Sequence, residues 1–282
     1  MAIKFLIDSA SDIKAVEAEK MGVSLIAMEI RFGTDVYLDG VDVTPEEFYD
    51  KLVESSELPK TSLINEYRWE EKFLELTSNG DQVIAITISS KLSGTYEAAK
   101  NASLKFRDKV FVVDSMNCSA GERLLLQYAM TLAKDGMSAI DIKNTLDKEK
   151  DKIQIMAMVN TLEYLRKGGR ISSVVAVAGT MLSIKPVVAL VEGKVKLVGK
   201  AMGSKKANNL LNSLVQKHGI DFSRPLCTIW SGSDDTVLKK YVKDSAHIWE
   251  GKVKDVPMCM IGSTIGTHVG PGAVGVAFFA KA

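Results

Sequence analysis

The residues best suited to chemistry lie in a turn at positions 89–95 that is rich in hydroxyl groups and contains a glycine. The apolar run before it predicts a strand over residues 82–88, and residues 97–103 predict a helix after it. The first amide groups of a helix are unpaired and partly positive, so this turn suits a bound anion. Ser93 supplies a hydroxyl donor, and Gly94 lets the backbone approach the anion closely. On spacing alone, Ser93 is equally well explained as an ordinary helix N-cap.

Four further residues are candidates for binding the same anion or a partner. Thr61 and Ser62 add two hydroxyl donors, although a cap for the helix predicted over residues 66–76 explains them as well. His268 lies in a predicted glycine-rich loop, residues 265–272, where it either donates to an anion or caps a turn. Arg170 follows two glycines. It is either an exposed residue after a helix stop or a charged contact for a partner or a phosphate.

The composition predicts a soluble globular chain rather than a membrane or nucleic-acid-binding one. The chain has 282 residues, of which 46% are hydrophobic and 25% charged, with a formal net charge of +1. This length is enough for two domains. The longest uncharged stretch, residues 171–184, is too short to span a bilayer, and a strand predicted at residues 3–7 argues against a signal peptide. We therefore expect a cytoplasmic protein without stable membrane insertion.

The sequence contains no pattern typical of a metal site or a nucleotide cofactor. Its cysteines, Cys118, Cys227 and Cys259, are an odd number at unrelated positions. This argues against a disulfide framework or a zinc site and favours a reducing compartment. Residues 270–275 match a dinucleotide-binding pattern by letters, but the helix and the acidic residue that the motif needs do not follow. We expect no metal, no cofactor and no nucleic acid partner.

Three strand–turn–helix units predict the architecture of the first half. Strands predicted over residues 3–7, 82–88 and 109–113 each lead into a polar turn. Such alternation implies parallel strands joined by right-handed crossovers, hence a doubly wound, mainly parallel sheet. All three turns then meet at the carboxyl edge of the sheet, where open α/β sheets bind ligands. Ser9 with Asp12, and Ser119 with Glu122, match the capping-box pattern.

We expect an α/β fold of two domains, residues 1–150 and 151–282. A small insertion at about residues 23–62 is expected to pack on the first domain. It contains a helix that begins at Pro45 after the N-cap Thr44, and it ends in a polar turn at residues 59–62. The second domain is predicted to be a mixed sheet with flanking helices. It includes a hairpin around Glu192 and Gly193 and helices over residues 173–182 and 235–249.

Taken together, these motifs resemble those of the DegV family over the whole chain. The segments that carry the resemblance, in the family's order, are Asp8-Ser9, Lys60-Thr-Ser62, Leu92-Ser-Gly-Thr-Tyr96, Asp114-Ser115, Leu162-Glu-Tyr-Leu-Arg-Lys-Gly-Gly-Arg-Ile-Ser172, Ile184-Lys-Pro186 and Ile265-Gly-Thr-His-Val-Gly-Pro-Gly272. The resemblance implies a two-domain bacterial protein that holds a long-chain fatty acid, such as palmitate or oleate, between its domains. Several members are the FakB-type subunit of bacterial fatty acid kinase. Such a subunit presents the carboxyl group to a kinase subunit, which forms an acyl phosphate for phospholipid synthesis.

The resemblance also implies roles for single residues. Thr61 and Ser93 are expected to hydrogen-bond the carboxylate, with Ser62, the Gly94 amide and His268 close by. Arg170 is expected to engage the kinase, so that reversing its charge would spare lipid binding.

Two positions depart from the family pattern. Leu63 and Ile64 stand where the family often has Gln-Pro, and Met202 stands where kinase-binding members tend to carry arginine. A lipid carrier or sensor that meets no kinase is therefore an alternative.

An enzyme is a further alternative, with Ser93 as nucleophile and His268 as base of an esterase or acyl transferase. The sequence offers neither a nucleophile elbow nor a third residue to orient His268. Burial of about 15 CH₂ groups, by contrast, favours lipid binding by roughly 12 kcal/mol before association costs. Such a ligand needs an apolar slot with few polar anchors. We therefore expect a lipid-binding protein without catalytic residues.

Overall fold

The first sheet is built from the apolar runs that the sequence predicts as parallel strands. The computed structural model describes residues 2–172 and 183–281. The strand order is β2-β1-β6-β7, and every neighbouring pair is parallel. Its strands are β1 (Ile3–Asp8), β2 (Val23–Ile26), β6 (Gln82–Thr87) and β7 (Val110–Asp114). The predicted doubly wound sheet is thus confirmed, and its polar turns share one carboxyl edge.

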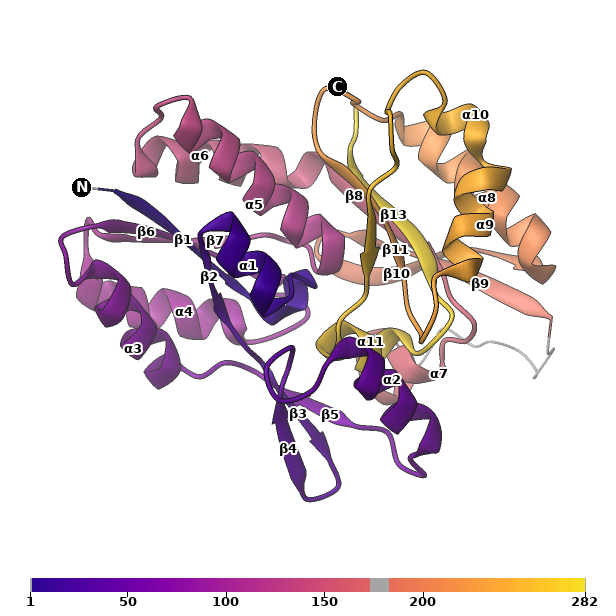
Figure 1. Cartoon of the computed structure of the whole chain (residues 1–282), viewed down its shortest axis with the longest axis horizontal. Coiled ribbons are helices and arrows are strands. Elements are labelled where there is room, and N and C mark those ends of the chain that lie inside the picture. The colour runs from indigo at the N-terminus through magenta and orange to yellow at the C-terminus, as the bar shows by residue number, and fades with distance from the viewer. Residues whose placement is uncertain (1, 173–182, 282) are drawn as a thin grey trace.

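Helices cover both faces of this sheet. Figure 1 shows α5 and α6 on one side and α3 and α4 on the other. The helices are α1 (Ala15–Met21), α3 (Glu66–Thr77), α4 (Thr95–Ser103), α5 (Ser119–Lys134) and α6 (Ala139–Glu149), with short 3₁₀ turns η1 (Ser9–Ser11), η2 (Leu104–Phe106) and η3 (Lys150–Lys152).

The second domain contains a mixed sheet, as predicted, in the order β10-β9-β8-β13-β11-β12. Only its β11–β12 pair is parallel. Its strands are β8 (Ile153–Met158), β9 (Ile184–Val191), β10 (Lys194–Met202), β11 (Leu226–Trp230), β12 (Met258–Met260) and β13 (Val274–Phe279). The hairpin predicted around Glu192 and Gly193 joins β9 to β10.

Five described helices belong to this domain: α7 (Glu163–Lys167), α8 (Gly203–His218), α9 (Thr236–Asp244), α10 (Ala246–Trp249) and α11 (Ser263–Val269). The prediction of a single helix over residues 235–249 is wrong, because the helix is interrupted at Ser245. The Ser245 hydroxyl donates to the Tyr241 carbonyl and accepts from the Trp249 indole. The helix predicted over residues 173–182 lies outside the described residues.

Helix α5 joins the two domains. It contacts β1 and β6 of the first sheet and β8, β11 and β13 of the second. One cluster of buried apolar residues runs through both domains, from Leu6 and Ile86 to Ile155 and Ile229. A single apolar core therefore spans both domains.

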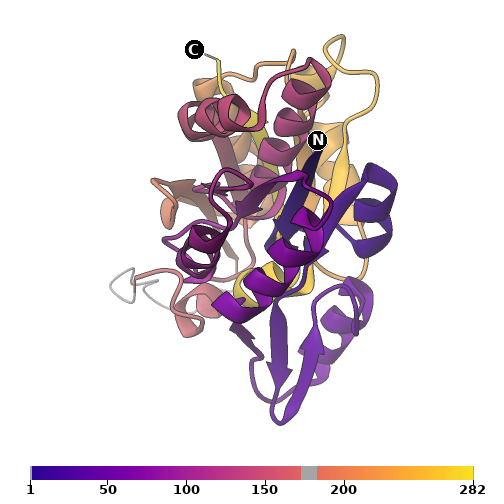
Figure 2. The ribbon, with the colours of Figure 1, turned by 90° about the vertical axis from the view of Figure 1, so that its left-hand side faces the viewer.

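The inserted segment packs differently from the prediction. Its strand β2 belongs to the first sheet, so the segment that departs from that sheet begins after β2. Figure 2 shows the rest extending from one end of the molecule as a three-stranded sheet with one helix. These elements are β3 (Glu29–Phe32), β4 (Asp35–Leu38), β5 (Lys60–Ser62) and α2 (Pro45–Glu54), and α2 begins with the predicted capping box of Thr44 and Glu47.

The insertion contacts both domains. Phe48 and Tyr49 of α2 pack with Met260 of the second domain in one hydrophobic cluster, and the Tyr49 hydroxyl donates to the Ile261 carbonyl. A side chain at Gly266 of α11 would collide with these rings, at 2.8 Å from Phe48. Towards the first domain, Glu46 of α2 pairs with Lys14, so the insertion lies against both domains rather than the first alone.

Neither capping box predicted at the sheet edge forms. The Ser9 hydroxyl accepts from the Met28 amide, and the Ser119 hydroxyl donates to the Asp12 carboxylate. Cys118 is the N-cap of α5 and makes no side-chain capping bond. Both serines thus serve contacts between distant segments, which override the local pattern.

Candidate functional site

Carboxylates at the ends of two parallel strands hold the turn that carries Ser93. Asp8 at the end of β1 accepts from the Ile88 amide at 2.8 Å. Asp114 at the end of β7 accepts from the Ser90 amide at 3.1 Å and from the Met116 amide at 3.0 Å. The turn after β6 is therefore tied to both neighbouring strands, and this fixes the start of α4 beside the second domain.

Ser93 lies immediately before α4, whose N-cap is Gly94. Its hydroxyl accepts from the Thr95 amide at 3.3 Å and lies 2.9 Å from Thr95 Oγ1. Ser93 thus does part of the work of an N-cap, and its hydroxyl still borders a pocket. Gly94 is exposed and has a φ of −73°, which any residue adopts, but a Cβ there would lie only 3.1 Å from Leu63 Cδ2.

His268 lies on helix α11, not in the predicted loop. Asp39, from the insertion, accepts from the Ser263 amide at 3.2 Å and the Thr264 amide at 3.1 Å. It also accepts from the Thr264 hydroxyl at 2.6 Å. This carboxylate, which is remote in the sequence, accepts hydrogen bonds from the first amides of α11. It thereby stabilises a helix in a glycine-rich sequence. The loop prediction is wrong for that reason.

Thr61 and His268 meet across the interface between the insertion and the second domain. Thr61 Oγ1 lies 3.0 Å from His268 Nε2. The other ring nitrogen, Nδ1, is buried and has no hydrogen-bond partner among the described residues. A Cβ at Gly168 would lie 2.2 Å from Nδ1, so this glycine makes room for the ring. The caps proposed for Thr61 and Ser62 are wrong, since both lie in β5 and Asn65 caps α3.

Arg170 is half-buried rather than exposed. Its Nε donates to the Leu92 carbonyl at 3.2 Å, and its Nη1 donates to the Gly168 carbonyl at 2.6 Å. These bonds link the segment after α7 to the turn that carries Ser93. Burial lowers the pKa of the guanidinium below its usual value. Arg170 is thus a partly desolvated cation at the boundary between the domains.

Five of the six candidate residues surround one pocket, here called the polar pocket. It is lined by Met28, Thr61, Ser62, Leu63, Ile88, Leu92, Ser93, Cys118, Leu165, Arg170, Val195, Thr264, Ile265, His268 and Val269. The sixth candidate, Gly94, is the next residue along the chain from Ser93 and does not line the pocket. The hydroxyl, imidazole and guanidinium groups that line the polar pocket come from both domains and the insertion, and they could hold an anion.

An apolar slot continues directly from the polar pocket. The two spaces share the walls Cys118, Leu165, Val195, Ile265 and Val269, and each has an open volume of about 60 Å³. The other residues that line the slot are Ser119, Ile155, Met156, Ala157, Val159, Val188, Ala189, Leu190, Ile229 and Ile261. Nearly all are aliphatic, so the slot suits a hydrocarbon chain.

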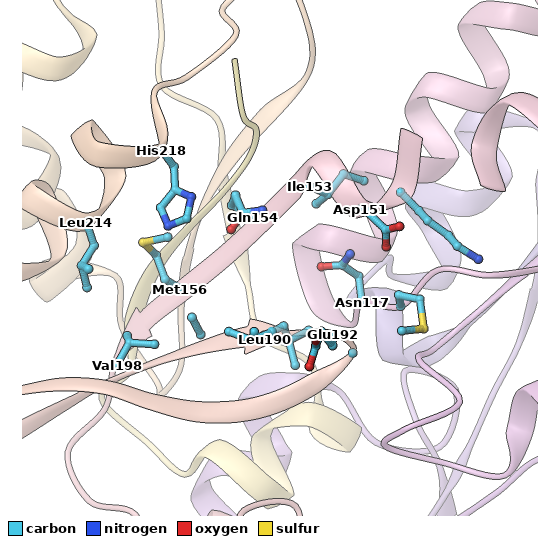
Figure 3. A pocket seen from close by; sticks show the side chains of 15 residues that line it. Asn117, Asp151, Ile153, Gln154, Met156, Leu190, Glu192, Val198, Leu214 and His218 are labelled. Carbon is cyan, nitrogen blue, oxygen red and sulfur yellow. The ribbon is translucent and has the colours of Figure 1, made fainter. Parts of the chain in front are cut away.

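Beyond the slot lies an outer cavity of about 500 Å³, which shares Met156, Ala189 and Leu190 with it. Figure 3 shows the residues around this cavity, with Leu214, His218 and Met156 towards one end and Asn117, Asp151 and Glu192 towards the other. Its rim is polar, with Glu192 among the residues that line it. Leu190 pairs with Val195 on the inward face of the sheet, whereas Met156 and Ala189 belong to the cluster that packs against α8.

Two residues that shape this site without contacting the proposed anion were not predicted from the sequence. Asp39 acts on α11 from more than two hundred residues away, and no local pattern signals that contact. Val195 of β10 had a signal, because lysine and apolar residues alternate over residues 194–197. Period-two alternation places Val195 on the inward face.

The geometry does not pair a nucleophile with a base. His268 Nε2 is bonded to Thr61, and the Ser93 hydroxyl is bonded to Thr95. Burial, and then the nearby Arg170 guanidinium, lower the pKa of His268 to about 4. His268 is therefore neutral near pH 7. The arrangement gives no support to the esterase alternative and favours the holding of an anion.

Acid is expected to destabilise the fold through His268. The unfolded histidine titrates near its ordinary value of 6.5 and the folded one near 4, so the unfolded state binds more protons between these values. The stability that depends on the neutral ring is present above pH 6.5 and is lost as the pH falls towards 4. This loss amounts to about 3 kcal/mol.

The measurement is urea unfolding at pH 7 and at pH 4.5 of the parent and of His268→Gln. The variant should lose less stability than the parent between the two pH values. An equal loss in both proteins would show that His268 is not the titrating group.

Residues 2–172 and 183–281 contain no group of three or more His, Cys, Asp or Glu side chains arranged to hold a metal ion. None of their helices combines the length and the apolar character that crossing a membrane requires.

Comparison with known proteins identifies relatives over the full length. A DegV domain-containing protein of Caldanaerobacter subterraneus is 31% identical over 280 residues, which is 99% of each chain. A DegV family protein of Thermus thermophilus, whose structure is described as fatty acid binding, has a TM-score of 0.88 and 28% identity, with 100% of both chains covered. A stearic acid-binding protein of Eubacterium ventriosum has a TM-score of 0.85 and 27% identity, with 100% and 99% covered.

The family model gives the same result. The model of the DegV family matches residues 2–281, nearly the whole chain. The two-domain α/β architecture described above is that of the similar structures. The chain therefore belongs to the DegV family.

Proposed function

We propose that this protein binds a long-chain fatty acid between its two domains, with the carboxylate in the polar pocket and the acyl chain in the apolar slot. The observation that carries the proposal is the continuation of one space into the other. A few hydrogen-bond donors lie at one end, and aliphatic side chains line the rest. Structures of similar DegV proteins that are described as fatty acid binding support it.

The carboxylate is proposed to accept hydrogen bonds from Thr61 and Ser93. If His268 Nε2 carries the proton, it donates to Thr61 Oγ1 and leaves the Thr61 hydroxyl proton for the carboxylate. Ser93 lies at the N-terminus of α4, where the helix dipole favours an anion. Ser62, which also lines the polar pocket, and the amide of Gly94, the residue after Ser93, are proposed to complete the head-group site.

The acyl chain is proposed to fill the apolar slot. Ligand pockets usually have volumes of about 300–1,000 Å³. The volume of the slot, about 60 Å³, is smaller than this range. Entry of a chain therefore requires the side chains Leu165, Val195 and Ile265 to move apart. Burial of roughly 15 CH₂ groups at about 0.8 kcal/mol each supplies the free energy for this movement.

We further propose that the bound fatty acid is presented to a kinase subunit that phosphorylates its carboxyl group. Arg170 supports this proposal, because a guanidinium in the wall of the polar pocket can bind a phosphate. A carrier or sensor without a kinase is the second candidate. It is favoured by Met202, which is 57% exposed at the end of β10. A pull-down with the catalytic subunit of fatty acid kinase distinguishes the two.

Mass spectrometry tests the binding proposal first. The purified protein is measured under native conditions, and its organic extract is then analysed for fatty acids. We expect one long-chain fatty acid per chain. A protein that is empty and also fails to take up added palmitate or oleate would contradict the proposal.

Val188→Phe is expected to shift binding towards shorter fatty acids. Val188 lines the apolar slot and pairs with Leu197 on the inward face of the sheet, so a phenyl ring there takes up space that the acyl chain would fill. The measurement is competition among saturated fatty acids of different chain lengths.

Val198→Phe is the matched control. Val198 lines the outer cavity but not the slot, and it is 37% exposed. This variant should keep the chain-length profile of the parent. The same shift in both variants would place the acyl chain somewhere other than the slot.

A further inference from the structure

Two of the three cysteines lie side by side in the second sheet. Cys227 in β11 and Cys259 in β12 are on neighbouring parallel strands, and the Cys227 thiol donates to Cys259 Sγ across 3.0 Å. Cys227 is 2% exposed and Cys259 is partly exposed, and both are free thiols. Positions that are unrelated in the sequence are thus adjacent in the fold.

The pair opens onto a pocket of about 690 Å³ that shares no described residue with the polar pocket or the slot. Arg123 of α5 and Arg224 line this pocket together with both cysteines. The hydrogen bond from Cys227 lowers the pKa of Cys259 to about 7 against the effect of burial, and the Arg123 guanidinium lowers it further. A partly exposed thiol beside a second thiol and an arginine is the environment typical of redox-active cysteines, although Arg123 also pairs with Glu17.

We propose that Cys259 and Cys227 form a peroxide-sensitive dithiol, a modification site outside the fatty acid site. The Cys259 thiolate attacks one oxygen of hydrogen peroxide, the O–O bond breaks, and the displaced hydroxide takes a proton to become water. Cys259 is then a sulfenic acid. The Cys227 thiol loses its proton and attacks the Cys259 sulfur, which releases hydroxide as a second water. In total, two thiols are oxidised to one disulfide, and one peroxide is reduced to two waters.

The bond requires β12 to shift, because diagonal partners on neighbouring strands lie further apart than the Cα atoms of a disulfide usually do. The two sulfurs must approach from 3.0 Å to about 2.05 Å. Strand β12 has three residues and lies at the edge of the sheet, so only β11 restrains it in the plane of the sheet. The partner of Cys259 in the register is Ile229, two residues beyond Cys227. Both thiols are therefore on the same face of the sheet, and the bond joins the strands diagonally.

The test uses the full-length, reduced protein and hydrogen peroxide. After treatment, free thiols are alkylated, and the intact mass and the peptides are measured. We expect the loss of two of the three thiols and a mass decrease of about 2 Da before alkylation. A peptide pair joined through Cys227 and Cys259 should appear, and dithiothreitol should separate it. Three remaining thiols, or a disulfide that includes Cys118 or links two chains, would overturn the proposal.

Single variants distinguish the attacking sulfur from the resolving one. In the Cys227→Ser variant, oxidation should stop at a sulfenic acid on Cys259, and dimedone should trap it. Cys259→Ser should leave Cys227 unlabelled by dimedone, since the thiol that remains is buried. Cys118→Ser should form the same disulfide as the parent. Equal dimedone labelling of Cys227 and Cys259 would contradict the assigned roles.

Discussion

Replacing Thr61 and Ser93 together by alanine is expected to lower the affinity for palmitate by about two orders of magnitude or more. A hydrogen bond to a charged group contributes roughly 1.5–3 kcal/mol, and about 1.4 kcal/mol corresponds to a factor of ten. The double variant loses both proposed donors to the carboxylate. It also leaves His268 Nε2 without its Thr61 partner. The measurement is the dissociation constant of palmitate for the parent and the variant.

Two comparisons make this result specific to the head group. Methyl palmitate carries the same acyl chain without the negative charge, so the double variant should bind it nearly as well as the parent does. Thr61→Ser keeps a hydroxyl at the position that bonds His268 and should retain most of the affinity for palmitate. Parent-like binding of palmitate by the double variant would show that the carboxylate lies elsewhere.

The parts of the site that follow from local sequence were predictable. Each strand of the first sheet leads into a polar turn. Parallel pairing of the backbones brings these turns to one edge, independently of side-chain contacts. Ser93 could therefore be placed near the ends of β1 and β7, and Asp8 and Asp114 hold its turn. The helix start at Pro45 was equally clear, because its cap lies within a few residues.

The parts that depend on distant contacts were not predictable. His268 was expected in a loop because the cap of its helix is Asp39, which is remote in the sequence. Ser119 was assigned to a capping box, but its hydroxyl bonds to Asp12 instead. Cys227 and Cys259 approach only through the pairing of β11 and β12. In each case the partner is set by the packing of whole elements, which no window of neighbouring residues contains.

Arg170→Glu is expected to weaken palmitate binding strongly, by roughly a hundredfold or more. The family resemblance assigns Arg170 to the kinase and predicts that charge reversal spares the lipid. The structure instead places this half-buried side chain in the wall of the polar pocket with Thr61 and Ser93. A carboxylate there would repel the ligand carboxylate in a partly desolvated space, where charges interact more strongly than in water. The measurement compares palmitate with methyl palmitate, and only palmitate should lose affinity.

Arg170→Lys and a kinase assay separate the two roles of this residue. Lysine keeps the charge but not the fork that bonds the Leu92 and Gly168 carbonyls, so palmitate binding should fall far less than in Arg170→Glu. If Arg170 serves only the kinase, Arg170→Glu will bind palmitate like the parent and lose acyl phosphate formation alone. If it serves the head group, both will fall together while methyl palmitate binding persists, which also excludes misfolding as the cause.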